Sequence, residues 1–169
     1  MKRILLVLFS AISLVCYGQT LTDENPILWE TYPHVQVSET EVEITFKAMM
    51  FKGWKLYSQY QYDVPDAPYP LELHYDASDS YEILGKNKKC EYSDHDLTCK
   101  VFVAEEGTPT SGLDPIFKTK VRYFKDKAVL KQRIKILSNE KIQIKGKISW
   151  QVCDASACIG GFYPIQLII

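Results

Sequence analysis

The chain has 169 residues, enough for one domain with its own hydrophobic core. It carries 20 basic and 21 acidic residues, and neither sign is concentrated in a block. A mild, mixed charge of this kind gives no support for nucleic-acid binding or for attachment to a membrane surface.

The N-terminus has the features of a signal peptide. Lys2 and Arg3 precede an apolar run over residues 4–15, which is too short for a membrane span but suits a signal-peptide core. We expect cleavage after Gly18, which leaves one domain over residues 19–169. That domain has 18 basic and 21 acidic residues, because only Lys2 and Arg3 are lost, and its net charge is −3.

A bacterial lipoprotein signal also ends in cysteine, so lipidation of Cys16 is an alternative to simple cleavage. Val15 is bulkier than the small residue usually found before a lipidated cysteine, and this disfavours the alternative. No second apolar run of spanning length follows. The mature chain is therefore predicted to be periplasmic or secreted, without a transmembrane segment.

Strand periodicity dominates the rest of the chain. Residues 41–47 alternate polar and apolar side chains, and residues 141–152 do so with every even position apolar or small. Residues 118–124 and 128–136 are predicted to form a hairpin that turns at residues 125–127. Residues 162–169 are predicted to be a last strand, apolar enough to be buried on both sides.

Two segments are predicted to be irregular, namely residues 62–75, with three prolines, and the Gly-, Ser-, Thr- and Pro-rich residues 107–115. No segment has an apolar helical stripe over three turns, and the candidate strands are rich in β-branched and aromatic residues. Short strands separated by turn signals predict an all-β fold, a β-sandwich of immunoglobulin type.

Removal of the signal peptide leaves four cysteines in a compartment where disulfides persist. Four cysteines allow three pairings, and their grouping favours the local ones. Cys90 and Cys99 have alternating surroundings, which indicate a hairpin closed by a structural disulfide. Cys153 and Cys158 lie at the end of a strand and on the turn after it.

The second pair has the setting that thiol–disulfide exchange requires. A turn of small residues lets the sulfurs of Cys153 and Cys158 bond near the surface, where another thiol reaches them. The second cysteine then resolves the mixed disulfide. A structural bridge is the alternative, and its stabilisation of about 2 kcal/mol for so short a loop does not separate the two interpretations.

Several segments resemble the N-terminal periplasmic domain family of the thiol-disulfide interchange protein DsbD, an immunoglobulin-like, disulfide-bond corrector domain. Cys153 and Cys158 lie late in the chain, just before the final strand, as that family's active cysteines do. Residues 53–59, 81–86 and 114–136 resemble further family segments. The likeness covers most of residues 26–169.

The resemblance implies electron transfer by the Cys153/Cys158 pair, with either cysteine as the partner-bonded one. It places Tyr57 and Asp154 around the active site, although Tyr57 is equally well interpreted as a core or interface residue. Glu82 and Ile83 would belong to a cap loop over the cysteines, and a plain strand edge is the preferred alternative for them.

The partners implied by the resemblance are periplasmic thioredoxin-like proteins, including those of cytochrome c maturation, or disulfide isomerases. Because the chain ends at Ile169, a membrane electron donor would be a separate protein. The sequence departs from the family in having no proline directly after Cys158, and in the pair Cys90 and Cys99, which the family pattern does not contain.

Other chemistries have weaker support. Zinc sites usually place two to four residues between paired thiolates, whereas the first pair here encloses eight, so no metal or other cofactor is expected. The main alternative is an immunoglobulin-like binding module with two structural disulfides, to which the tyrosines of residues 57–69 would contribute a protein-binding surface.

Overall fold

The computed structural model describes residues 20–93 and 96–169, and for residues 87, 89–93 and 96–98 it describes the backbone alone. The described residues form strands joined by turns and loops, with no helix among them. The strands are β1 (Ile27–Thr31), β2 (Val35–Gln36), β3 (Glu41–Met50), β4 (Lys55–Tyr57), β5 (Glu72–Asp76), β6 (Tyr81–Leu84), β7 (Lys86–Ser93), β8 (Asp96–Phe102), β9 (Ala104–Glu106), β10 (Thr110–Leu113), β11 (Lys120–Lys125), β12 (Lys127–Ile136), β13 (Gln143–Cys153) and β14 (Cys158–Ile168).

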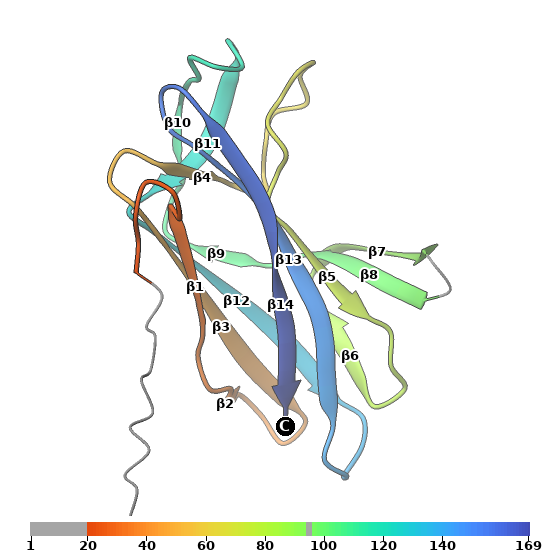
Figure 1. The fold of residues 1–169 in the computed structure, drawn as a ribbon. Helices are drawn as coiled ribbons and strands as arrows, with labels where there is room; N and C mark the ends of the chain where they lie inside the picture. The colour runs from red at the N-terminus through yellow and green to blue at the C-terminus, as the bar shows by residue number, and fades with distance from the viewer. Residues whose placement is uncertain (1–19, 94–95) are drawn as a thin grey trace, which may run out of the picture.

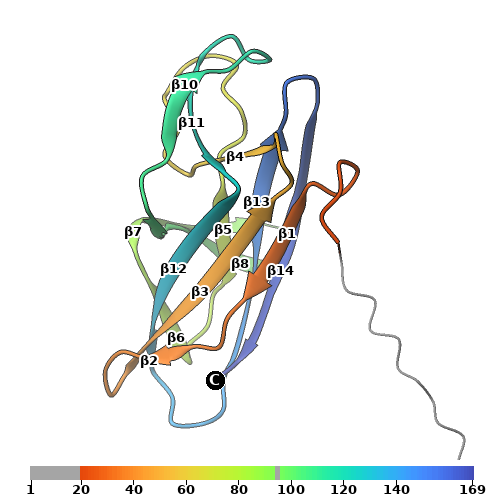
Figure 2. The ribbon, with the colours of Figure 1, turned by 90° about the vertical axis from the view of Figure 1, so that its left-hand side faces the viewer.

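The strands make two antiparallel sheets that pack face to face (Figures 1 and 2). The first sheet has the order β1-β3-β12-β6, with β2 paired to β3 and β9 paired to β12. The second has the order β10-β11-β4-β13-β5-β8-β7, with β14 paired to β13. The turn between β13 and β14 lies at the same end of the sandwich as β4, β10 and β11 (Figure 1).

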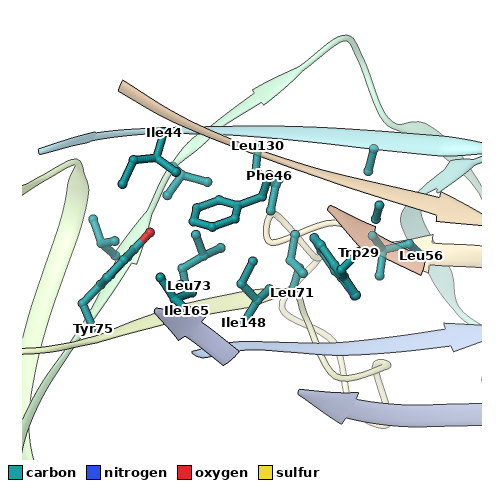
Figure 3. Close-up of a cluster of buried hydrophobic side chains, with 14 of the residues drawn as sticks. Trp29, Ile44, Phe46, Leu56, Leu71, Leu73, Tyr75, Leu130, Ile148 and Ile165 are labelled. Carbon is teal, nitrogen blue, oxygen red and sulfur yellow. The ribbon is translucent and has the colours of Figure 1, made fainter. Parts of the chain in front are cut away.

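The core fills the space between the sheets. In β3 every second residue is buried, and in β13 Ile144, Ile148 and Val152 are fully buried. Figure 3 shows Phe46 and Leu130 of the first sheet facing Ile148 of the second. Each sheet has one apolar face, and packing the two faces together removes both from water. The predicted all-β, immunoglobulin-like sandwich is confirmed.

Residues 118–136 do not form the predicted hairpin. β11 pairs with β4 and β10 in the second sheet, whereas β12 pairs with β3 in the first. Asp126, with a φ of 63°, connects them, and its carbonyl accepts the Met50 N–H at 2.8 Å. The alternation of apolar residues could not reveal this crossing. Two strands with one apolar face each show the same alternation whether they lie in one sheet or in opposite sheets.

The last strand is not buried on both sides. β14 alternates, with Ile165 1% exposed but Phe162 and Ile168 70% and 59% exposed. Its only partner among the described strands is β13, so it is an edge strand whose outer side chains nothing described covers. Apolar composition alone therefore overstated its burial.

The two segments predicted to be irregular are strand-free only in part. Residues 62–71 form a loop, as expected, and β5 begins at Glu72. Residues 110–113, within the second segment, form β10. Three of its four residues are exposed, and the strand is held by backbone pairing with β11. A search for alternating apolar residues cannot detect a strand of this kind.

Candidate functional site

Cys153 and Cys158 form a disulfide across the turn between β13 and β14. They are register partners at the end of the hairpin, with an S–S distance of 2.00 Å and Cα atoms 4.1 Å apart. The backbone N–H of Asp154 donates to the carbonyl of Ala157 at 3.0 Å. The bridge thus closes a turn of four residues at one end of the sandwich.

Asp154 gives this turn its shape. Its Oδ1 accepts the backbone N–H groups of Ser156 and Ala157, both at 2.7 Å, and the Ser156 hydroxyl at 3.1 Å. These backbone hydrogen bonds lower the pKa of the exposed carboxyl below its ordinary value. A short polar side chain that bonds the backbone two and three residues ahead is a common way to stabilise a turn.

The two sulfurs differ in access to solvent. Cys153 is fully buried, whereas Cys158 is half-buried. Cys153 does not face the main core, since its neighbour Val152 does and side chains alternate along a strand. It faces outward and is covered there by a second, small hydrophobic cluster.

We call this group the outer cluster; its members are Tyr57, Ile116, Phe117, Val121, Tyr123, Cys153 and Cys158. Tyr57 is fully buried, and its ring meets that of Phe117 edge-on at 5.8 Å between centroids. Phe117 belongs to the turn that connects β10 to β11. That turn therefore supplies apolar cover to the outer face of β4 and β13, where the disulfide lies.

A polar network lies beside the outer cluster. The Tyr57 hydroxyl donates to Oδ2 of Asp114 at 2.7 Å, and the Lys55 ammonium forms an ion pair with the same oxygen at 2.5 Å. Oδ1 of Asp114 accepts the backbone N–H groups of Ile116 and Phe117 at 2.9 and 3.2 Å. Both partners of the ion pair are largely shielded, since the side chain of Asp114 is 0% exposed and that of Lys55 is 12% exposed.

The network shifts the ionisation of its members. Burial, then the hydrogen bond to Asp114, raises the pKa of Tyr57 well above its ordinary range. Burial alone would raise the pKa of Asp114, but the bonds from Lys55, from Tyr57 and from two backbone N–H groups outweigh it and lower that pKa. Tyr57 is therefore a neutral donor and Asp114 a carboxylate at neutral pH.

The structure brings together only some of the residues predicted around the active site. Tyr57 packs in the outer cluster with Cys153, and Asp154 lies between the two cysteines. Glu82 and Ile83 lie on β6, which pairs with β12 at the opposite end of the sandwich from the disulfide (Figure 1). Ile83 is buried in the main core and Glu82 is exposed, so the strand interpretation holds and the cap-loop interpretation does not.

The other cysteine pair lies on the β7–β8 hairpin. Cys90 and Cys99 are register partners, as predicted, and Cys99 is disulfide-bonded. The side chain of Cys90 and residues 94–95 lie outside the described part of the chain. The structural role predicted for this pair stays a prediction.

Sequence reasoning missed Lys55, Asp114, Phe117 and Tyr123 as neighbours of the disulfide. One signal was present: in Lys55-Leu56-Tyr57, alternation puts Lys55 and Tyr57 on the face opposite to the core residue Leu56. Asp114 carried no such signal, because its contact with Tyr57 joins residues 57 positions apart.

Neither a metal site nor a membrane-spanning helix emerges from residues 20–93 and 96–169. Within those ranges, no three His, Cys, Asp or Glu side chains gather closely enough to hold a metal ion. In the same residues no helix has the length and apolar character to cross a membrane. The predicted signal peptide and the alternative lipidation at Cys16 lie outside the described residues.

Comparison with known proteins identifies a structural relative. No protein-family model matches the chain, and no curated protein sequence matches it. Among solved structures, the chain is similar to the N-terminal periplasmic domain of ScsB from Proteus mirabilis, with a TM-score of 0.55 and 13% sequence identity. The match covers 88% of this chain and 49% of the other, so the chain spans about half the length of that structure.

Proposed function

We propose that the chain is an exported thiol–disulfide exchange domain that acts on protein partners through Cys153 and Cys158. The observation that carries this proposal is the asymmetric bridge at the β13–β14 turn. Cys158 is half-buried at the margin of the outer cluster and lies where another thiol can approach, whereas Cys153 is fully buried within that cluster. Exchange needs one accessible sulfur and one that is protected until it resolves the intermediate.

The difference in accessibility between the two sulfurs supports a separate role for each. In the dithiol form, the Cys158 thiolate attacks a partner disulfide, and a Cys158–partner bond forms as the partner's own S–S bond breaks. The displaced partner sulfur leaves as a thiolate and takes up a proton. Cys153 then attacks Sγ of Cys158 as a thiolate, which re-forms the Cys153–Cys158 bridge and releases the second partner thiol. Two electrons pass to the partner, and the cysteine pair is oxidised.

Further support comes from the fold and from resemblance. The structural relative is a periplasmic domain, which agrees with an exported chain and with a compartment where disulfides persist. The segments that resemble DsbD N-terminal domains favour periplasmic thioredoxin-like or disulfide-isomerase proteins as partners. A membrane electron donor would then restore the dithiol.

The alternative function is an immunoglobulin-like binding module with two structural disulfides. The complete burial of Cys153 favours it, because a structural bridge is expected to be protected. Tyr69 and Phe162 are 79% and 70% exposed, and the Tyr69 N–H donates to Gln151 on β13, two residues before Cys153. These aromatics suit a docking surface in either function, so they do not discriminate between the two.

Reaction with glutathione disulfide separates the two functions. The protein is reduced under native conditions, mixed with glutathione disulfide, quenched by alkylation at successive times and mapped by peptide mass. Exchange predicts a transient glutathione adduct on Cys158 that decays to the Cys153–Cys158 bridge. Failure to reduce this bridge without unfolding the protein would overturn the proposal in favour of the binding module.

A further inference from the structure

We propose that Lys55 is the residue that stabilises the Cys153 thiolate once the disulfide is reduced; this inference rests on the proposed exchange function. Cys153 must act as a thiolate to resolve the mixed disulfide, yet it is fully buried. Burial in apolar surroundings disfavours the charged form of a thiol. A working pair of this geometry therefore needs a compensating positive charge close to Cys153.

Lys55 has the position that this charge requires. It is the register partner of Cys153 in the antiparallel pairing of β4 with β13. Side chains of directly opposed residues lie on the same face, with Cβ atoms about 5 Å apart. The Lys55 side chain is 12% exposed, so solvent screens its charge less than that of a surface lysine.

The contacts of Lys55 hold it on this face. Its Nζ lies 5.4 Å and 5.8 Å from the ring centroids of Tyr123 and Tyr57, two members of the outer cluster. Among the described residues, its only acceptor is Oδ2 of Asp114. An ammonium group has three donors, so Lys55 has N–H groups left for a second anion.

Asp114 reduces the effect of Lys55 without cancelling it. Its carboxylate is shared among four donors, namely Lys55, the Tyr57 hydroxyl and the backbone N–H groups of Ile116 and Phe117. These bonds stabilise the carboxylate, so its negative charge does not depend on Lys55 alone. Asp114 thus holds the ammonium on the face of the sheet that carries Cys153, and the Cys153 thiolate becomes a second counter-charge for it.

The ionisable groups that face this position come from β4, from β11 and the turn before it, and from the β13–β14 hairpin. The residues around Cys153 are Lys55 and Tyr57 on β4, Asp114 before β11, Tyr123 and Lys125 on β11, Cys158 on β14 and Asp154 in the β13–β14 turn. Lys125 is the register partner of Lys55 on its other side, but it is exposed. Lys125 is therefore a matched control, with the same charge on the same face but screened by water.

The test is a pH titration of the single Cys153 thiol. In a Cys158→Ala protein, thiolate ultraviolet absorbance is recorded against pH and corrected by the Cys153→Ala/Cys158→Ala protein. We expect Lys55→Met to raise the midpoint by about one pH unit or more, because an opposite charge at this range shifts a pKa by about one to three units. Lys55→Arg should restore the midpoint, and Lys125→Met should leave it unchanged.

Asp114 supplies a variant with the opposite sign. Asp114→Asn removes the negative charge that competes with the Cys153 thiolate for Lys55, so it should lower the Cys153 midpoint. Damage to the fold would not shift the midpoints of Lys55→Met and Asp114→Asn in opposite directions. If Lys55→Met does not fold, Lys55→Met/Asp114→Asn removes both buried charges, and it should still raise the midpoint. Equal midpoints in the Lys55→Met and Lys125→Met proteins would overturn the inference.

The titration is independent of the proposed function. A Cys153–Cys158 bridge that glutathione cannot reduce in the native protein defeats the exchange function, whatever the titration shows. A bridge that exchanges normally in a Lys55→Met protein with an unchanged Cys153 midpoint defeats only the role of Lys55.

Discussion

Lys55 and Cys153 face each other across β4 and β13, on the outer side of the second sheet, away from the main core. The turn between β10 and β11 contacts both residues' environments. Its Asp114 forms an ion pair with Lys55, and its Phe117 packs in the outer cluster that contains Cys153. The disulfide at the end of the β13–β14 hairpin therefore lies next to the buried ion pair of Lys55 and Asp114.

The two cysteines should behave differently when each is left alone. Cys153→Ala leaves the half-buried Cys158 thiol, and Cys158→Ala leaves the fully buried Cys153 thiol. We expect the first variant to form a mixed disulfide with glutathione disulfide at least about tenfold faster, because exchange requires access to the attacking sulfur. Intact-protein mass over time measures both rates. Equal rates would contradict the assigned roles, and aggregation of either variant would favour a structural bridge.

The Tyr57 hydroxyl should contribute measurably to stability. Tyr57→Phe removes a buried donor to the Asp114 carboxylate at 2.7 Å. Hydrogen bonds to charged groups contribute about 1.5–3 kcal/mol, so the free energy of unfolding in urea should fall by about that amount. Tyr32→Phe is the control, since its hydroxyl donates to Glu30 at 3.1 Å from an exposed position. A Tyr57→Phe protein as stable as the Tyr32→Phe protein would show that the network contributes little.

The Asp114 carboxylate should make stability sensitive to acid. Its pKa lies below the ordinary 3.8 in the folded protein, so its stabilising contribution is present above 3.8 and is lost as the pH falls through the lower folded value. The stability deficit of Asp114→Asn should therefore be largest near neutral pH and should shrink below about pH 4. Urea unfolding of both proteins across this range measures the difference. A deficit that is constant with pH would contradict the ion-pair account.

Gly146 should be required for the pairing of β13 with β5. A Cβ at this position would lie 2.2 Å from the His74 carbonyl oxygen and 3.0 Å from the Tyr75 Cα, both of which are backbone atoms that cannot move independently. Gly146→Ala should lower the free energy of unfolding by about 1–3 kcal/mol or more. Gly160→Ala on β14 is the matched control, because its nearest atom is 3.4 Å away. Thermal unfolding that ranks the two variants equally would show that the sheets adjust at this point.

The fold class could be read from the sequence because burial follows strand period. Val42, Ile44 and Phe46 alternate with polar residues, and the structure buries all three. The same signal does not identify strand partners, so the crossing of the chain at Asp126 was predicted as a hairpin. It also could not show that β14 is an edge strand with Phe162 exposed.

The candidate site was predictable only where it is local. Cys153, Asp154 and Cys158 lie within six consecutive residues. The short run of small and polar residues between the two cysteines predicts the turn that brings them together. Lys55 is brought to the site by the pairing of β4 with β13, and Asp114 by a turn that is distant in the sequence from both strands. Periodicity assigns each residue a face but no neighbour, and for this reason the buried ion pair was not predicted.

The most direct test of the central claim is a redox titration of the native protein in glutathione buffers, with alkylation and peptide mass mapping of each cysteine. Thiol–disulfide exchange predicts that Cys153–Cys158 titrates between about −120 and −270 mV, the range of exchange proteins, while the bridge at Cys99 stays oxidised. If both bridges instead stay oxidised until the potential falls below about −300 mV, the exchange function is contradicted. Cys153–Cys158 would then be a structural disulfide of a binding module.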